Sequence, residues 1–149
     1  MIVTEMDKSA CLALLKDSRF GRLACAKDNQ PYVVPISFVV EGNYLYGFSL
    51  LGQKVDWMRI NSKVCVQVDE LEGPQKWRSV VISGLYEELP DRIGFKVQRD
   101  RAWSLLSQHA QWWEPGGLKP MGEQPTPHLF YRIGIGEISG RQASPADQD

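Results

Sequence analysis

The sequence predicts a mainly β fold, a small antiparallel barrel with peripheral helices. Six short stretches rich in β-branched and aromatic residues are separated by turn-forming residues. Most of them follow one another directly, without the strand–helix–strand rhythm of a doubly wound parallel sheet. The length of 149 residues, with 43% hydrophobic and 23% charged residues, suits one domain. We expect this domain over residues 1–141 and a disordered tail over 142–149.

Three helices are expected beside the barrel. The first begins after Asp7, whose carboxylate can cap it. A short second helix is expected over 53–60, and a third follows Pro90 and Asp91. The apolar stripes of the first and third helices consist of Cys11, Leu14, Leu15, Ala102, Leu105, Leu106 and His109.

The six predicted strands are residues 22–27, 32–40, 44–48, 64–69, 77–89 and 128–139. Turn-forming residues at 28–30 and 41–43 join the first three strands as hairpins. Residues 70–76 are expected to form a loop, and residues 112–127 an ordered loop pinned by its tryptophans.

The strand over 32–40 has the clearest pattern, because alternate residues on both of its faces are mostly apolar. We therefore expect both faces to be buried. Pro35 has no N–H to donate to a neighbouring strand, so we expect an edge, a bulge or a break near the middle. Gly84 predicts a bulge in the strand over 77–89.

Charge and hydropathy exclude several classes of protein. The 17 Lys and Arg residues and 18 Asp and Glu residues leave a net charge of −1, which argues against nucleic-acid binding and against a polybasic membrane clamp. No window resembles a membrane-spanning helix or a signal peptide. Cys11, Cys25 and Cys65 are odd in number and widely spaced, so we expect small buried side chains in a reducing cytoplasm.

Motifs for familiar catalytic chemistry are absent from the sequence. His109 and His128 lie on separate predicted elements without acidic residues at metal-ligand spacing, so no metal site is expected. There is no nucleophile elbow and no phosphate-binding loop of the Walker type. Adjacent carboxylates on a strand point to opposite faces, so no acid–base pair and no catalytic residue is assigned.

One stretch has the features of a phosphate site. A strand ends at Phe48–Ser49, and after a short loop a helix opens near Gln53 and Lys54. The first turn of a helix presents unpaired N–H groups and the positive end of its dipole. Ser49 adds a hydroxyl, Gly52 permits close approach of the backbone, and Lys54 supplies charge. The alternative reading is a capped helix with a solvated lysine.

The Pro-interrupted strand suits a flat ligand. Backbone groups around Pro35 that no neighbouring strand uses could hydrogen-bond to a planar ring, and apolar and aromatic side chains would form the walls. The five tryptophans are otherwise expected in core or interface packing.

The order of the motifs resembles that of the pyridoxamine 5′-phosphate oxidase-related flavin-binding split barrels, and most closely the nitroimidazole-resistance branch. The resemblance covers residues 8–141. It rests on residues 21–24, 31–38, 46–49 with Gly52 and Lys54, 61–65, 77–84 and 135–141.

This resemblance implies a six-stranded antiparallel split barrel that forms a homodimer with FMN at the dimer interface; FAD and haem are the alternatives. Ser49, Gln53 and Lys54 would hold the phosphate. The edge of the isoalloxazine ring would be lined by Val34, Pro35, Ile36 and Ser37. Phe48 would lie close to the ring, and Trp77 would wall the pocket or approach from the partner subunit.

The implied function is that of a flavin-dependent oxidoreductase acting on a small molecule. Members of the nitroimidazole-resistance branch often carry a histidine where this chain has Phe48, which cannot exchange a proton. Two alternatives remain open. One is a non-catalytic protein that binds flavin or haem, with His109 or His128 as possible iron ligands, and the other is a dimeric scaffold without flavin.

Overall fold

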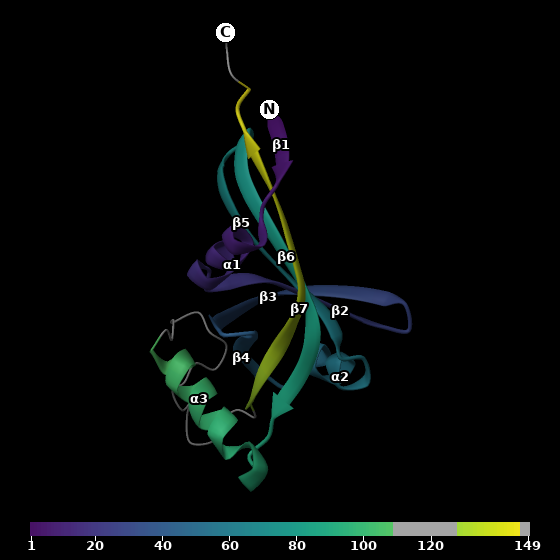
Figure 1. Cartoon of the computed structure of the whole chain (residues 1–149). Coiled ribbons are helices and arrows are strands. Elements are labelled where there is room, and N and C mark those ends of the chain that lie inside the picture. The colour runs from purple at the N-terminus through teal and green to yellow at the C-terminus, as the bar shows by residue number, and fades with distance from the viewer. Residues whose placement is uncertain (109–127, 147–149) are drawn as a thin grey trace, which may run out of the picture.

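The computed structural model describes residues 1–108 and 128–146. Its seven described strands form one antiparallel sheet in the order β1-β7-β4-β3-β2-β5-β6, and a further pairing between β7 and β6 closes six of them into a ring. The strands are β1 (Ile2–Glu5), β2 (Phe20–Lys27), β3 (Gln30–Glu41), β4 (Tyr44–Leu50), β5 (Lys63–Gly73), β6 (Lys76–Leu89) and β7 (His128–Ser144). The predicted mainly β split barrel is confirmed (Figure 1).

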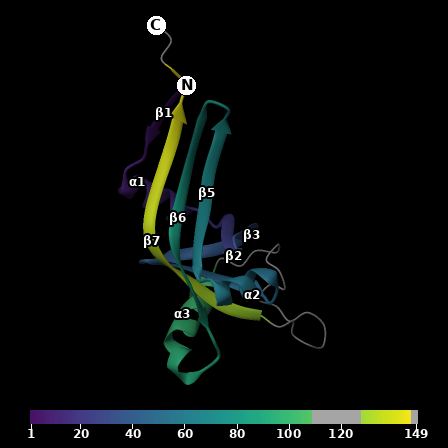
Figure 2. The same ribbon diagram turned by 90° about the vertical axis from the view of Figure 1, so that its right-hand side faces the viewer.

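Closure of the ring depends on β7, which is long enough to pair with β1, β4 and β6. Its first half pairs with β4 on one side and with β6 on the other. Its second half runs beyond the barrel beside β6, which pairs there with β5, so the three strands rise side by side in Figure 2. The short β1, which the sequence did not predict, pairs with the end of β7 outside the ring.

The helices begin where the sequence predicts. They are α1 (Lys8–Asp17), α2 (Gln53–Ile60) and α3 (Lys96–Ser107), the last preceded by a 3-10 turn, η1 (Ile93–Phe95). The carboxylate of Asp7 caps α1 by accepting a hydrogen bond of 2.8 Å from the N–H of Ala10. None of the described helices is long and apolar enough to cross a membrane.

The predicted hairpin turns are confirmed. Asp28 and Asn29 have φ angles of 50° and 65°, a conformation that short polar side chains tolerate between β2 and β3. Gly42, with φ of 59°, turns the chain from β3 into β4. The register between β6 and β7 shifts at Ser83–Gly84, so the bulge predicted at Gly84 is confirmed.

Two apolar clusters hold these elements together. One fills the barrel interior and packs α1 and α2 against it, and it contains Cys11, Cys25 and Tyr131. Cys65 is half-buried, and all three cysteines are free. The second cluster lies under α3, where Ala102 and Leu106 are buried against β3, β4 and β7.

Two segments that the sequence predicts to be irregular, 70–76 and the start of 142–149, belong largely to strands in the structure. The loop expected over 70–76 is a hairpin, because β5 runs through Gly73. Ion pairs of 2.8 Å between Glu70 and Arg78 and of 2.9 Å between Glu72 and Lys76 link the two strands. The tail expected over 142–149 also begins later, because β7 pairs with β1 and β6 up to Ser144 and Ala143. His109 and the loop expected over 112–127 lie outside the described residues, as do residues 147–149.

The prediction that both faces of the strand over 32–40 are buried is wrong for its first half. Val33 is 62% exposed, and Pro35 is exposed as well. The reason is that β4 pairs with β3 only from Phe38 onward, so that earlier residues have β2 as their one described strand neighbour. The N–H of Phe38 donates to Arg19 on the β2 side, so by alternation the backbones of Val33 and Pro35 face the other edge. Of the three expectations for Pro35, the edge is confirmed.

Candidate functional site

One cavity of about 450 Å³ lies where the edge of β3, the end of β4 and the start of α2 meet. This volume is typical of a small-molecule site. Of the predicted site residues, the cavity is lined by Val34, Pro35, Ile36, Ser37, Phe48, Ser49, Gly52, Gln53 and Lys54. Segments from three parts of the chain are therefore brought together as the sequence predicted.

Lys54 gives the cavity its charge. The side chain is half-buried at the start of α2, and it forms no ion pair with any described carboxylate. Burial lowers the pKa of the Lys54 ammonium, and the nearby Cys25 thiol offsets this only in part. A half-buried cation without a counter-ion among the described residues favours an anionic ligand, because the ligand supplies the missing charge.

The first turn of α2 adds backbone donors at the same place. The N-cap is Gly52, whose position has no side chain to cap the helix, and the first intrahelical bond runs from the N–H of Asp56 to the carbonyl of Gly52. The N–H groups of Gln53, Lys54 and Val55 therefore have no acceptor within the helix. Apart from Gly52 and its two chain neighbours, no described residue has an atom within 4 Å of where a Cβ on Gly52 would be, so the described part of the chain leaves the approach to these donors open. Together with Lys54, they form an arrangement suited to a phosphate.

Ser49 is placed differently from the other phosphate candidates. It is only 4% exposed, and its hydroxyl donates a hydrogen bond of 2.8 Å to the carbonyl of Leu50. It can donate to a ligand only after rotating away from this carbonyl. Gln53, in contrast, is exposed at the mouth of the cavity.

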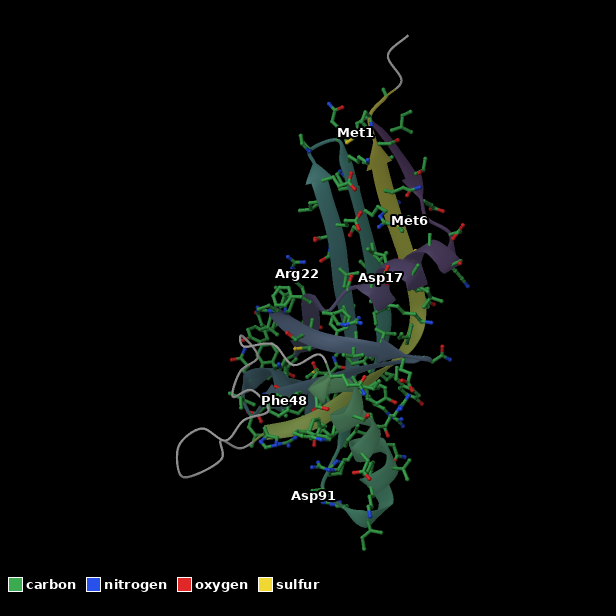
Figure 3. The ribbon with its side chains drawn as sticks, turned by 90° about the vertical axis from the view of Figure 1, so that its left-hand side faces the viewer. Met1, Met6, Asp17, Arg22, Phe48 and Asp91 are labelled. Atoms are coloured by element: carbon green, nitrogen blue, oxygen red, sulfur yellow. The ribbon has the colours of Figure 1, made fainter. Side chains whose placement is uncertain are left out.

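Apolar side chains and the edge of β3 form the rest of the cavity. Val34 and Ile36 line it from β3, and Phe48 lines it from β4. The Phe48 ring packs against His128 and Phe130, with ring centroids 4.9 Å and 5.7 Å away. In Figure 3, Phe48 lies next to the start of β7. These flat apolar walls beside a backbone edge suit a planar heterocycle.

Four lining residues were not among the predicted ones: Phe20, Tyr32, Leu50 and Leu106. Tyr32 alternates with Val34 and Ile36 on the same strand, so strand periodicity could have found it. Leu106 comes from α3, and no local pattern shows that this helix packs beside β4.

Trp77 does not wall this cavity within the chain. It is the second residue of β6, on the extension beyond the barrel, where it lines two other pockets together with residues of β7. The sequence-based expectation that it walls the pocket of its own chain is therefore wrong, because the extension carries it away from α2. Its approach from a partner subunit stays a prediction.

Metal-binding clusters are absent from the described residues. His128, one of the two candidates for an iron ligand, packs with its ring on Phe48 and Phe130. The other candidate, His109, lies outside the described residues.

Comparison with known proteins identifies relatives over nearly the whole length. Residues 7–142 match the family model described as pyridoxamine 5′-phosphate oxidase. An uncharacterized protein of Rhizobium meliloti is 44% identical over 146 residues, which is 96% of this chain and 97% of that protein. The sequence-based resemblance to this family is confirmed.

Solved structures agree with this match. The crystal structure of an FAD-binding protein from Mesorhizobium loti is 52% identical, with a TM-score of 0.81 over 97% of this chain and 100% of that chain. A structure described as a 5-nitroimidazole antibiotic resistance protein from Bacteroides thetaiotaomicron is 15% identical. Its TM-score is 0.70 over 95% of this chain and 89% of that chain, and this likeness concerns the fold alone.

Proposed function

Because this chain belongs to the pyridoxamine 5′-phosphate oxidase family, we propose that its cavity binds a flavin nucleotide and that the protein is an oxidoreductase for a small molecule. The observation that carries this proposal is Lys54, a half-buried cation without a described counter-ion beside the open first turn of α2. The Mesorhizobium loti protein, described as FAD-binding, supports the same choice of ligand.

The cavity residues fit both parts of a flavin. Its phosphate would be held by Lys54 and by the N–H groups that begin α2. The edge of its ring would lie along β3, where the Val33 N–H can donate and the carbonyl of Pro35 can accept. When bound, the flavin supplies the electron-transfer chemistry.

The side chains of this cavity would bind and orient the flavin, and they would exclude water from its ring. Val34, Ile36 and Phe48 are apolar and would shield the ring from solvent. Tyr32 and Lys54 are the titratable groups among the described lining residues, and neither has an acidic neighbour in that lining. We therefore assign no general acid or base to the cavity wall.

FMN is the smallest flavin that carries both the ring and a phosphate, and it is the cofactor that we propose. FAD carries the same ring and first phosphate, so it would use the same residues. The space around Gly52 and the exposed Gln53 would leave room for its additional nucleotide. Extraction of the bound pigment and chromatography against FMN and FAD standards distinguishes the two.

We further propose a homodimer with the flavin at its interface. Val33 is 62% and Phe20 is 45% exposed beside the cavity, and a second copy of the chain would cover these apolar side chains. Trp77 would then reach the site of the partner. Light scattering measures the oligomeric state. The free cysteines Cys11, Cys25 and Cys65 support a reducing compartment, and we propose the cytoplasm.

The test of flavin binding uses the full chain and its visible absorption spectrum before and after denaturation. We expect two flavin bands and a pigment that denaturation releases. Lys54→Gln should reduce flavin content, whereas the matched variant Lys16→Gln, on the exposed face of α1, should not. A colourless protein that takes up neither FMN nor FAD would refute the proposal.

Oxidoreductase activity is tested separately. The loaded protein is incubated with reduced nicotinamide nucleotide and with oxygen or a nitroaromatic as acceptor, and consumption of the nucleotide is followed. Turnover supports the enzyme. Flavin bound without turnover across a panel of acceptors would favour the non-catalytic carrier.

A further inference from the structure

Tyr32 brings a polar group to the wall of the cavity. Its side chain is half-buried and lines the cavity from β3, on the same face of the strand as Val34 and Ile36. The hydroxyl forms no hydrogen bond with any residue in the described part of the chain. A phenol at a cavity wall without a protein partner can donate a hydrogen bond to a ligand.

The register of β2 and β3 places Tyr32 near Lys54. Tyr32 pairs directly with Cys25 of β2, so these two side chains lie on the same face of the sheet. The Cys25 thiol is also close enough to the Lys54 ammonium for their charges to interact. Tyr32 and Lys54 therefore share Cys25 as a neighbour.

A ring contact with α2 places Tyr32 at the same end of the cavity. The centroids of the Tyr32 and Trp57 rings are 5.5 Å apart. Trp57 follows Lys54 by three residues on α2, so their side chains are neighbours on one side of the helix. This helix packs against β2, the strand beside β3 (Figure 1). The side of α2 that carries Lys54 therefore faces Tyr32.

The corner formed by Tyr32 and Lys54 suits an anion. Lys54 has no ion pair with any described carboxylate, and no carboxylate occurs among the described residues that line the cavity. The ammonium and the phenol are both hydrogen-bond donors, and they come from two different elements. An anion at this corner could accept from both, and donors from two directions fix its position better than one.

We propose that Tyr32 is a specificity-determining residue, which selects phosphorylated flavins over riboflavin by donating a hydrogen bond from its hydroxyl to the phosphate. The inference rests on the proposed function, in which Lys54 and the start of α2 hold that phosphate. Contact with Trp57 restricts the Tyr32 ring, so little freedom is lost when the hydroxyl binds. A hydrogen bond to a charged group is worth about a tenfold change in affinity or more.

The test compares FMN with riboflavin, which share the ring and the ribityl chain and differ in the phosphate. Each is titrated into the flavin-free full chain, and binding is followed by flavin fluorescence. The wild type should bind FMN at least about tenfold more tightly than riboflavin. Tyr32→Phe keeps the ring beside Trp57, so it should weaken FMN binding about tenfold and leave riboflavin binding unchanged.

Tyr44→Phe is the matched control. Tyr44 is also a half-buried tyrosine, but it lies on β4 outside the lining of the cavity, where its ring packs on Arg132. This variant should bind both flavins as the wild type does. A loss of FMN binding in Tyr44→Phe equal to that in Tyr32→Phe would overturn the inference, because the effect would then not depend on the cavity.

Equal affinities of the wild type for FMN and riboflavin would overturn the inference and leave flavin binding intact. An unchanged FMN affinity in Tyr32→Phe would also overturn it, as would an equal loss for both flavins. If the wild type takes up neither flavin, the proposed function fails. Calorimetry with inorganic phosphate then tests Tyr32 directly. Weaker phosphate binding in Tyr32→Phe than in the wild type supports the inference, and equal or undetectable binding overturns it.

Discussion

Replacing Tyr131 by phenylalanine is expected to stabilise the protein. The Tyr131 side chain is fully buried in the barrel, and its hydroxyl has no hydrogen-bond partner among the described residues. A phenol loses its hydrogen bonds to water when it is buried, and here nothing replaces them. Tyr131→Phe removes the hydroxyl and keeps the ring. The unfolded state then loses a hydroxyl that water solvates, whereas the folded state loses a hydroxyl without a hydrogen bond, so the substitution favours the folded state.

The magnitude follows from the burial and from a neighbouring residue. A buried, unsatisfied hydroxyl costs about 1–3 kcal/mol. Tyr86, whose ring centroid is 5.6 Å from that of Tyr131, offers the matched comparison because its hydroxyl donates a bond of 3.0 Å to Glu88. Tyr86→Phe should therefore destabilise the protein by about 1–2 kcal/mol, because a hydrogen bond to a charged acceptor is lost.

Urea and thermal unfolding measure the stability of the two variants relative to the wild type. Each kcal/mol should move Tm by about 2–4 °C for a chain of this size. We expect Tyr131→Phe above the wild type and Tyr86→Phe below it. A Tyr131→Phe variant that is less stable than the wild type would refute the reasoning, because it would show that the hydroxyl has a favourable partner such as a buried water.

Three further predictions concern the same core and the site. Gly47→Ala should destabilise the fold by about 2 kcal/mol in urea unfolding, because the new Cβ would lie 2.2 Å from the Tyr131 ring; an equally stable variant would mean that the ring moves aside. Burial raises the pKa of Tyr131, so the folded state keeps this proton where the unfolded state loses it. The free energy of unfolding should therefore keep the full contribution of Tyr131 below about pH 10 and decrease as the pH rises further. The decrease should be less steep in Tyr131→Phe, and equal slopes for both proteins would contradict this. Lys54→Gln should weaken flavin binding at least about tenfold in a fluorescence titration, and an unchanged Kd would remove Lys54 from the site.

Periodicity and turn chemistry sufficed to predict the barrel, whereas most of the candidate site residues came from the resemblance to a known family. Strand alternation and the turns at Asp28–Asn29 and Gly42 are local properties, and the structure has them where they were expected. The resemblance implied that residues 34–37, 48–49 and 52–54 belong to one site, and all of them line one cavity. The donors at the start of α2 followed from the expectation that a helix opens near Gln53 and Lys54, because the first turn of a helix has unpaired N–H groups.

The failures concern features that depend on partners distant in sequence. β1 is exposed along its whole length and pairs only with β7, so neither its pattern nor its composition marks it. Leu106 reaches the cavity because α3 packs beside β4, and Trp77 leaves it because β5 and β6 extend beyond the barrel. The apolar face around Val33 resembles a core face in sequence, yet no described element of the chain covers it.

The position of β7 in the chain also bears on how the protein is made. It is the last described strand, and it alone joins β4 to β6, so the ring cannot close until the ribosome has passed His128. Until then the edges of β4 and β6 stand open, and the pairing that closes them spans most of the chain. Such distant contacts slow folding. We therefore expect ring closure to be a late step after synthesis, with the flavin loaded only once β7 has joined β4 beside Phe48.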